Sequence, residues 1–426
     1  MNQVKALLGA KKDYFTGLCH PEFQDLAERF SQFQDMRPKN GGAALAVYFR
    51  GQPVVDIYTG WAGHEQLWQA QHAAMCYSTG KGVLATLAHI VVSHGFLDYD
   101  DPLAKYWPEF AQQGKAQITL RHILAHQSGL FDLRNLIADA SEMLDWTHML
   151  EVFEQATPRF EPGKDNAYQA LTFGWLVGGI LEKATGRKLN DLMQQYLVEP
   201  LDLDFAYYGV PEARLAEIAR PFRNPHKTKV STDTDAVKTA KSSTPNKQRK
   251  APWSEKVIEW TGQDPQDFKD AMIPKGMKNF SFFQPEAMQA VIPAANGVFT
   301  ARSLAKIYAM MAAGGQWNGQ QLIRPEVFHT LSRIQNFKRD RVMPIPMNWR
   351  LGYHRVLTLG KQVKKGFGHI GYNGSGAWCD PKRELSFAYI HNHSIGSITG
   401  DYRLWALTQE SLRCADQVLK GRKGWF

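Results

Sequence analysis

The sequence is poor in cysteine and contains no long apolar run, and each absence narrows the class of protein. Four cysteines occur among 426 residues, far apart and without a CxxC pair. This spacing forms neither a disulfide framework nor a zinc-ribbon or redox motif, so we expect a reducing, cytoplasmic location. No stretch approaches about 18 consecutive apolar residues, and residues 1–20 lack the apolar core of a signal peptide. We therefore expect no membrane span and no secretory leader.

Motifs for nucleotide cofactors and for metals are also missing. The chain has no Walker or dinucleotide-binding fingerprint, and we expect no cofactor. His122 and His126 are four residues apart, but the residues between them lack the glutamate of the zinc-protease motif. His391 and His393 alternate on a predicted strand without an identifiable third ligand. We interpret all four histidines as structural and predict no metal site.

Strand patterns occur near both ends of the chain. Residues 42–60 form two apolar, β-branched and aromatic runs separated by Arg50-Gly51-Gln52-Pro53, which predicts a β-hairpin. Three further short strand candidates lie near the other end, at residues 350–357, 374–379 and 385–391. The apolar spacing of residues 402–420 predicts a helix after them. Strands at both ends, with few between them, indicate a discontinuous α/β domain that contains an insertion.

The middle of the chain is mainly helical in pattern. Residues 83–91 keep the i, i+3/i+4, i+7 spacing of one buried helix face. Thr119 is the expected N-cap of a helix over residues 120–126. Residues 171–184 predict another apolar helix, which ends at Gly186.

The resulting domain prediction is a discontinuous α/β domain, residues 1–105 and 290–426, and a mainly helical domain, residues 106–289. The second domain holds much of the net charge of +9, because residues 223–256 contain nine Lys/Arg and three Asp/Glu. This segment is low in hydrophobic residues, and its single aromatic residue is Trp253, near its end. We interpret it as a basic, flexible loop at about residues 224–254, and we do not expect nucleic-acid binding.

The segment Ser78-Thr79-Gly80-Lys81 precedes the helical pattern of residues 83–91. A serine hydroxyl is a poor nucleophile until a neighbouring base takes its proton. A lysine three residues on, in the first helical turn, brings its amine over the serine hydroxyl. The helix N-terminus also disfavours the ammonium form and stabilises an oxyanion. S-x-x-K alone occurs by chance in many proteins, where the serine is only an N-cap. The surrounding residues must therefore show whether Ser78 is a nucleophile.

Five segments, in order along the chain, provide that context. They are Ala44-Leu45-Ala46-Val47-Tyr48 with Pro53-Val54-Val55-Asp56, Ser78-Thr79-Gly80-Lys81-Gly82-Val83, Leu120-Arg121-His122-Ile123-Leu124-Ala125-His126-Gln127-Ser128-Gly129-Leu130, Glu161-Pro162-Gly163 with Tyr168-Gln169-Ala170, and Gly368-His369-Ile370-Gly371 leading to Asp380-Pro381. Together they resemble the serine β-lactamase and penicillin-binding-protein family, particularly its class C-like branch and the family VIII carboxylesterases. The resemblance spans about residues 42–393, apart from the basic segment.

The resemblance implies a fold and a set of roles. The implied fold is α/β (α+β) and β-lactamase/transpeptidase-like, an antiparallel sheet flanked by helices with a mainly helical inserted domain. The implied nucleophile is Ser78, with Lys81 as its base. Tyr168 matches the catalytic tyrosine, a phenol held as phenolate-like by the lysine that relays protons. The alternative hydrolase elbow G-x-S-x-G is only half matched, because Cys76 replaces its first glycine.

Two departures from the family pattern bear on the substrate. Where penicillin-recognising members carry Lys-Thr-Gly, this chain has His369-Ile370-Gly371, so the lysine and threonine that help to grip a lactam carboxylate are missing. We expect Gly371 to keep the close approach of the strand to the substrate. His369 is expected to take some cationic or hydrogen-bonding role. The N–H of Tyr372 is expected to join that of Ser78 in an oxyanion hole. Ala170 replaces an asparagine common in lactamases.

These departures favour a carboxylesterase that acts on small, short-acyl esters through an acyl-enzyme. A β-lactamase or D-amino-acid peptidase on the same scaffold remains an alternative, as does an acyltransferase, which differs only in the acceptor. A non-enzyme alternative is a binding or assembly protein that has the same scaffold and an inactive site. The partner that we expect is thus a small-molecule ester, and the sequence leaves the oligomeric state open.

Overall fold

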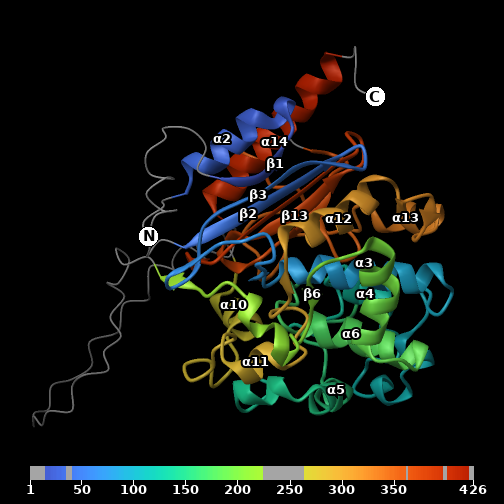
Figure 1. Ribbon diagram of the computed structural model, residues 1–426. Helices are drawn as coiled ribbons and strands as arrows, with labels where there is room; N and C mark the ends of the chain where they lie inside the picture. The colour runs from blue at the N-terminus through green and yellow to red at the C-terminus, as the bar shows by residue number, and fades with distance from the viewer. Residues whose placement is uncertain (1–14, 35–40, 224–262, 361–362, 397–400, 422–426) are drawn as a thin grey trace, which may run out of the picture.

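The two ends of the chain meet in one antiparallel sheet, as Figure 1 shows for the computed structural model. The structure describes residues 15–34, 41–223, 263–360, 363–396 and 401–421. The strand order is β1-β3-β2-β14-β13-β12-β11, with β4 paired to β3. The strands are β1 (Thr16–Cys19), β2 (Gly42–Phe49), β3 (Gln52–Gly63), β4 (Gln66–Leu67), β11 (His354–Arg355), β12 (Phe367–Ile370), β13 (Gly376–Asp380) and β14 (Leu385–His391).

The predicted hairpin is confirmed as β2 and β3. Its turn is Arg50-Gly51, and both residues have positive φ, 52° and 74°. A two-residue turn of this kind matches the right-handed twist of the flanking strands. Gln52 and Pro53, expected in the turn, belong to β3.

Alternation along the strands separates two hydrophobic layers. In β2, Leu45 and Val47 pack into a core with α2 (Gln24–Gln32) and α14 (Tyr402–Lys420), whereas Ala44 and Ala46 pack into the core on the opposite face. That opposite face carries α12 (Ala301–Ala312), which packs on β14, β2 and β13. Figure 1 shows α2 and α14 together on one side of the sheet and α12 on the other. Because α14 packs on α2, the helices of both chain ends share one layer.

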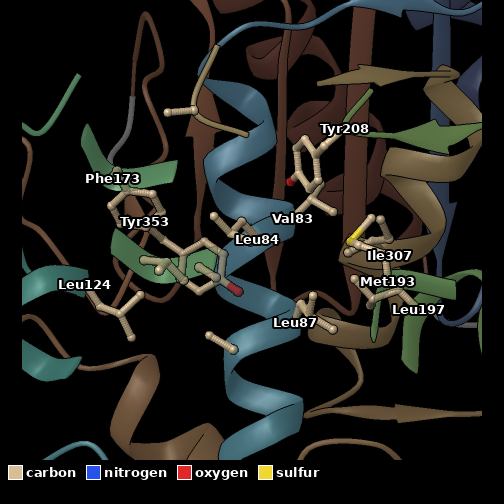
Figure 2. Close-up of a cluster of buried hydrophobic side chains, with 14 of the residues drawn as sticks. Val83, Leu84, Leu87, Leu124, Phe173, Met193, Leu197, Tyr208, Ile307 and Tyr353 are labelled. Atoms are coloured by element: carbon tan, nitrogen blue, oxygen red, sulfur yellow. The ribbon is translucent and has the colours of Figure 1, made fainter. Parts of the chain in front are cut away.

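The helical half is organised around α3 (Thr79–Ser93), in which every residue except Ser93 is buried. A helix that is apolar all round belongs in the centre of a fold. It contacts α6 (Thr172–Thr185), α13 (Pro325–Leu331) and β12. Figure 2 shows side chains from several elements, Leu124, Phe173, Met193, Leu197, Tyr208, Ile307 and Tyr353, arranged around Val83, Leu84 and Leu87 of α3. The N-terminus of α3 is thereby held in a fixed place.

The remaining described elements are short. The α-helices are α4 (Leu120–Leu124), α5 (Trp146–Gln155), α7 (Leu189–Met193), α8 (Glu199–Leu201), α10 (Pro265–Met272) and α11 (Pro285–Gln289). Three small sheets pair β5 (Ala74–Met75) and β6 (Ala206–Tyr207) with β8 (Val298–Phe299), β9 (Gln316–Trp317) with β10 (Gln320–Gln321), and β7 (Phe222–Arg223) with β15 (His393–Ser394). Within the described residues, no helix is long and apolar enough to cross a membrane.

Most predicted helices and strands are confirmed, with one helix and one strand shorter than predicted. Thr119 does cap α4 through His122 N, and Gly186 ends α6 in the left-handed conformation. However, α4 stops at Leu124, and His126 has a φ of 58°, so the prediction that the helix extends to residue 126 is wrong. Similarly, only β11 forms within predicted strand 350–357, because the chain turns at Gly352, where φ is 81°. The predicted basic loop, 224–254, lies outside the described residues, and the domain boundaries stay a prediction.

Candidate active site

Ser78 lies where a short strand turns sharply into the central helix. Strand β5 ends at Met75, and Tyr77 adopts a φ of 48° before α3 begins. A left-handed conformation is uncommon for an aromatic residue and is found where the surrounding structure enforces it, often at functional sites. Ser78 occupies the N-cap position, yet its side chain makes no capping hydrogen bond. Its hydroxyl is therefore available to Lys81.

Lys81 is completely buried, and its Nζ lies 2.9 Å from Ser78 Oγ. The same nitrogen donates to the carbonyl oxygens of Ala170 at 2.6 Å and Ala294 at 2.9 Å. Burial places the pKa of Lys81 well below its ordinary value, which favours the neutral amine. A neutral amine has two N–H donors and one lone pair. With both donors directed to the carbonyls, the lone pair is left for the Ser78 hydroxyl.

Tyr168 completes the cluster on the other side of Ser78. The Tyr168 ring is almost fully buried, its centroid lies 5.0 Å from Lys81 Nζ, and its hydroxyl hydrogen-bonds to the Ser78 side chain. Burial raises the pKa of Tyr168, and the Ser78 hydrogen bond lowers it less. The structure thus favours a protonated phenol rather than the phenolate-like state that the family resemblance implies. Of the two groups, Lys81 is the one suited to accept the serine proton.

Two residues without a sequence signal, Trp349 and Asp340, hold Tyr168 in place together with His126, which was expected to be structural. The indole of Trp349 stacks on the Tyr168 ring, with centroids 5.4 Å apart and planes 7° from parallel. Asp340, a buried carboxylate, accepts from Tyr168 N and from Trp349 Nε1. His126 accepts from Gln169 N through Nδ1, and its ring lies 5.0 Å from that of Tyr168. An isolated Asp or Trp in a loop carries no motif, so only their contacts reveal this role.

His369 lies in β12 beside the cluster, 2% exposed. Burial holds its pKa well below the ordinary value, with the neighbouring His354 and Lys81 contributing in the same direction. This lowered pKa favours the neutral imidazole, and thus the hydrogen-bonding role expected for His369 over the cationic one. Its Nδ1 lies 2.8 Å from the Ile370 carbonyl oxygen and, as the donor there, leaves Nε2 as a hydrogen-bond acceptor.

Gly371 brings the end of β12 against the turn before Ser78. A Cβ at this position would lie 2.1 Å from the carbonyl oxygen of Cys76. The glycine thus permits a backbone-to-backbone approach, whereas the sequence prediction assigned it to an approach to substrate. Tyr372 follows at the surface, 40% exposed. No acceptor for the N–H group of Ser78 or of Tyr372 lies in the described part of the chain, so each is available to a bound ligand.

The hollow beside Ser78 is lined by three methionines, more than any other residue type. Its walls are Ser78, Tyr168, Met272, Met343, Met347, His369, Ile370 and Tyr372. Within the described residues, no charged side chain faces it. Methionine is flexible and apolar, which suits it to irregular or variable apolar groups. No pattern in the sequence predicted methionine walls.

The other histidine candidates take structural places. His122 caps the start of α4 and is separated from His126 by the helix end, so the two do not share a helix face. His391 ends β14 and accepts from His393 N. Throughout the ranges given above, no group of three or more His, Cys, Asp or Glu side chains is placed to hold a metal ion.

Comparisons with known proteins show the family of this chain. The model of the family described as Beta-lactamase matches residues 26–410. The chain belongs to this family. It is 36% identical over 391 residues to "Esterase/beta-lactamase LipL" of Mycobacterium tuberculosis, covering 90% of this chain and 84% of the relative. The family resemblance predicted from the five segments is confirmed.

Two solved structures share the whole fold. A family VIII carboxylesterase superposes with a TM-score of 0.79 and 26% identity, covering 94% of this chain and 99% of the other. A penicillin-binding-protein homologue from Caulobacter crescentus gives 0.75 and 28%, with the same coverage. The predicted β-lactamase/transpeptidase fold is therefore confirmed, and the protein is a serine hydrolase of this family.

Proposed function

We propose that the protein hydrolyses small, uncharged carboxylic esters with short acyl groups through an acyl-enzyme on Ser78. The observation that carries the proposal is the 2.9 Å contact between Ser78 Oγ and a buried Lys81 whose other two hydrogen bonds go to carbonyl oxygens. This arrangement supplies a neutral base directed at one hydroxyl. It requires no cofactor.

Acylation follows from the positions of the groups. Lys81 Nζ takes the Ser78 proton as Oγ bonds to the ester carbonyl carbon, and the carbonyl oxygen becomes an oxyanion. The N–H groups of Ser78 and Tyr372 are the donors that we assign to this oxyanion. As the C–O bond to the alcohol breaks, the leaving oxygen receives the proton from Lys81, directly or through the Tyr168 hydroxyl. The products of this step are the free alcohol and the acyl-Ser78 ester.

Deacylation repeats the same chemistry with water. Lys81, neutral again, takes a proton from water while the water oxygen bonds to the acyl carbon. The C–O bond to Ser78 then breaks, and Ser78 Oγ regains the proton from Lys81. The carboxylic acid leaves, and the enzyme returns to its starting state. An alcohol in place of water would give acyl transfer from the same intermediate.

The walls of the site favour esters over lactams. Penicillin-type substrates carry a carboxylate, and His369 is neutral while the remaining wall residues are uncharged. Ala170 offers Lys81 its backbone carbonyl and has no side-chain amide for an acylamide substrate. The similarity to a relative named as both esterase and β-lactamase makes lactam hydrolysis the second candidate.

The test is a paired initial-rate assay on p-nitrophenyl acetate and butyrate and on a chromogenic cephalosporin. Ser78→Ala should lower ester hydrolysis by at least about a thousandfold, because removing a nucleophile abolishes the covalent route. Ser141→Ala, at an exposed serine far from the site, is the matched control and should retain the wild-type rate.

Mass spectrometry of the wild type after reaction with a fluorophosphonate should place the label on Ser78. Undiminished esterase activity in Ser78→Ala would contradict the proposal, and faster turnover of the cephalosporin than of the esters would favour the lactamase. Absence of both labelling and Ser78-dependent turnover would favour the binding or assembly protein.

A further inference from the structure

A second hollow, of about 670 Å³, lies at the opposite end of β12 from His369. It is formed where α13 meets the residues before β12 and the turn between β13 and β14. Six basic side chains line it, and we call it the basic hollow: His329, Arg333, Arg350, Lys364, Lys365 and Lys382. None of them lines the hollow beside Ser78. Its volume lies within the range typical of ligand sites, roughly 300–1,000 Å³.

No carboxylate balances this charge within the described lining. The remaining wall residues are prolines, a phenylalanine, a serine and an isoleucine. Asp380, adjacent to Pro381 in the sequence, is paired with Arg383. Glu326 on α13 is paired with Arg324. The positive field of the hollow is therefore left without a counter-charge from these neighbours.

Arg350 is the unusual member of the group, because it is 2% exposed and makes no ion pair with any described residue. Its Nε donates to the Ser332 carbonyl oxygen at 2.9 Å and its Nη2 to that of Lys364 at 3.1 Å. Neither acceptor carries a net charge, and Nη1 is buried without a hydrogen-bond partner. The guanidinium also lies over the Phe367 ring, with Cζ 5.8 Å from the centroid, which is an uncharged contact. Burial lowers the pKa of Arg350 to about 10. A buried guanidinium without an anion is costly, and a bound anion would remove that cost.

We propose that the basic hollow binds a small, soluble phosphate monoester or inorganic phosphate. Lys364, Lys365 and Lys382 are exposed and supply mobile ammonium groups for the phosphate oxygens, while Arg350 supplies a fixed charge in the wall. The recessed position of Arg350 favours a free ligand, which can enter the hollow, over a headgroup held in a flat bilayer.

The basic hollow is linked to the Ser78 site through adjacent residues. Arg350 directly follows Trp349, whose indole stacks on Tyr168. Lys365 lies two residues before β12, which ends beside His369 and Gly371. A ligand on Arg350 would thus contact the same short segment that supports Tyr168.

The test is a titration of the full-length protein with inorganic phosphate by calorimetry, at low ionic strength. A pH of about 8 keeps a phosphate monoester dianionic, since its second pKa is about 6. The expected result is saturable binding that weakens by at least about tenfold in the double variant Lys365→Glu/Lys382→Glu, because two attractive charges become repulsive. The control Lys278→Glu makes the same change of sign at an exposed lysine outside the hollow and should bind as the wild type does.

A parallel titration uses glycerol 3-phosphate and vesicles that contain phosphatidic acid. Binding of the free monoester supports the proposal, and binding to vesicles alone contradicts it. Absence of saturable phosphate binding by the folded wild type overturns it, as does equal weakening in Lys278→Glu. Circular dichroism of each variant separates loss of binding from loss of fold.

Discussion

At the scale of single residues, the chemistry depends on the environment of Lys81. Its two carbonyl partners come from Ala170 and Ala294, which lie 89 and 213 residues away in the sequence. The four-residue motif brings Ser78 and Lys81 together, but it does not bury the amine. Burial and the two carbonyl acceptors decide that the amine is neutral and where its lone pair points.

A pH profile of ester hydrolysis tests whether the Lys81 amine is neutral. Because the pKa of Lys81 is lowered, the amine is neutral above that lowered value and takes a proton below it. We expect kcat/KM for p-nitrophenyl butyrate to fall on the acid side only when the pH is well below about 10.4, the ordinary lysine value.

The matched variant is Lys81→Arg, whose guanidinium stays protonated throughout. It should lack activity at every pH in the profile. A wild-type rate that keeps rising into the ordinary lysine range would show that Lys81 is protonated in the folded protein and would contradict the assignment.

At the scale of elements, the site depends on how closely the end of β12 approaches the turn before α3. Gly371 lies against the Cys76 carbonyl, and Gly82 of α3 lies against the Tyr308 side chain and His369. These two glycines let the strand and the helix pack at backbone distance. We expect the N–H groups of Ser78 and Tyr372, proposed as the oxyanion donors, to depend on this contact for their positions.

Gly371→Ala should therefore separate the two elements. A Cβ 2.1 Å from the Cys76 oxygen forces the backbone to move, with a typical cost of about 1–3 kcal/mol. A displacement near 1 Å in a catalytic group lowers a rate by about a hundredfold, so we expect kcat/KM to fall by that order.

Thermal denaturation and initial rates, measured together, check the prediction. The control is Gly421→Ala, where the nearest atom to a new Cβ is 3.5 Å away. Wild-type activity in Gly371→Ala would mean that the contact does not set the position of the donors.

At the scale of the whole molecule, the fold depends on contacts between the two chain ends. Phe30 of α2 packs edge-on against Tyr389 of β14, with ring centroids 6.4 Å apart. Arg413 of α14 also pairs with Asp25 of α2. Both chain ends therefore contribute to the layer on this face of the sheet.

Phe30→Ala should lower the free energy of unfolding by about 3–5 kcal/mol, because it leaves a cavity in this shared core. Leu18→Ala, at a β1 side chain that is 52% exposed, should change it by no more than about 0.5 kcal/mol. Urea denaturation, monitored by circular dichroism, measures the free energy of unfolding of both variants. Similar small effects in the two variants would mean that the N-terminal helix contributes little to the stability of the sheet.

The sequence by itself determined the features that depend on near neighbours. Two apolar runs around a turn predicted the hairpin, Gly186 predicted the end of α6, and apolar spacing predicted α14. The order of the five segments predicted the family. The hairpin and the helices depend on residues a few positions apart, where side-chain periodicity and capping can be recognised. The family depends on the order of short motifs along the chain.

Only the tertiary structure decided the state of the site. It placed Asp340 and Trp349 against Tyr168. It lined the hollow beside Ser78 with Met272, Met343 and Met347. Burial in the fold also favours the neutral imidazole of His369. It also gathered the basic residues around Arg350 from three separate segments. Burial and charge proximity depend on which distant residues meet, and pKa shifts follow from burial and proximity together. No local pattern in the sequence carries that information.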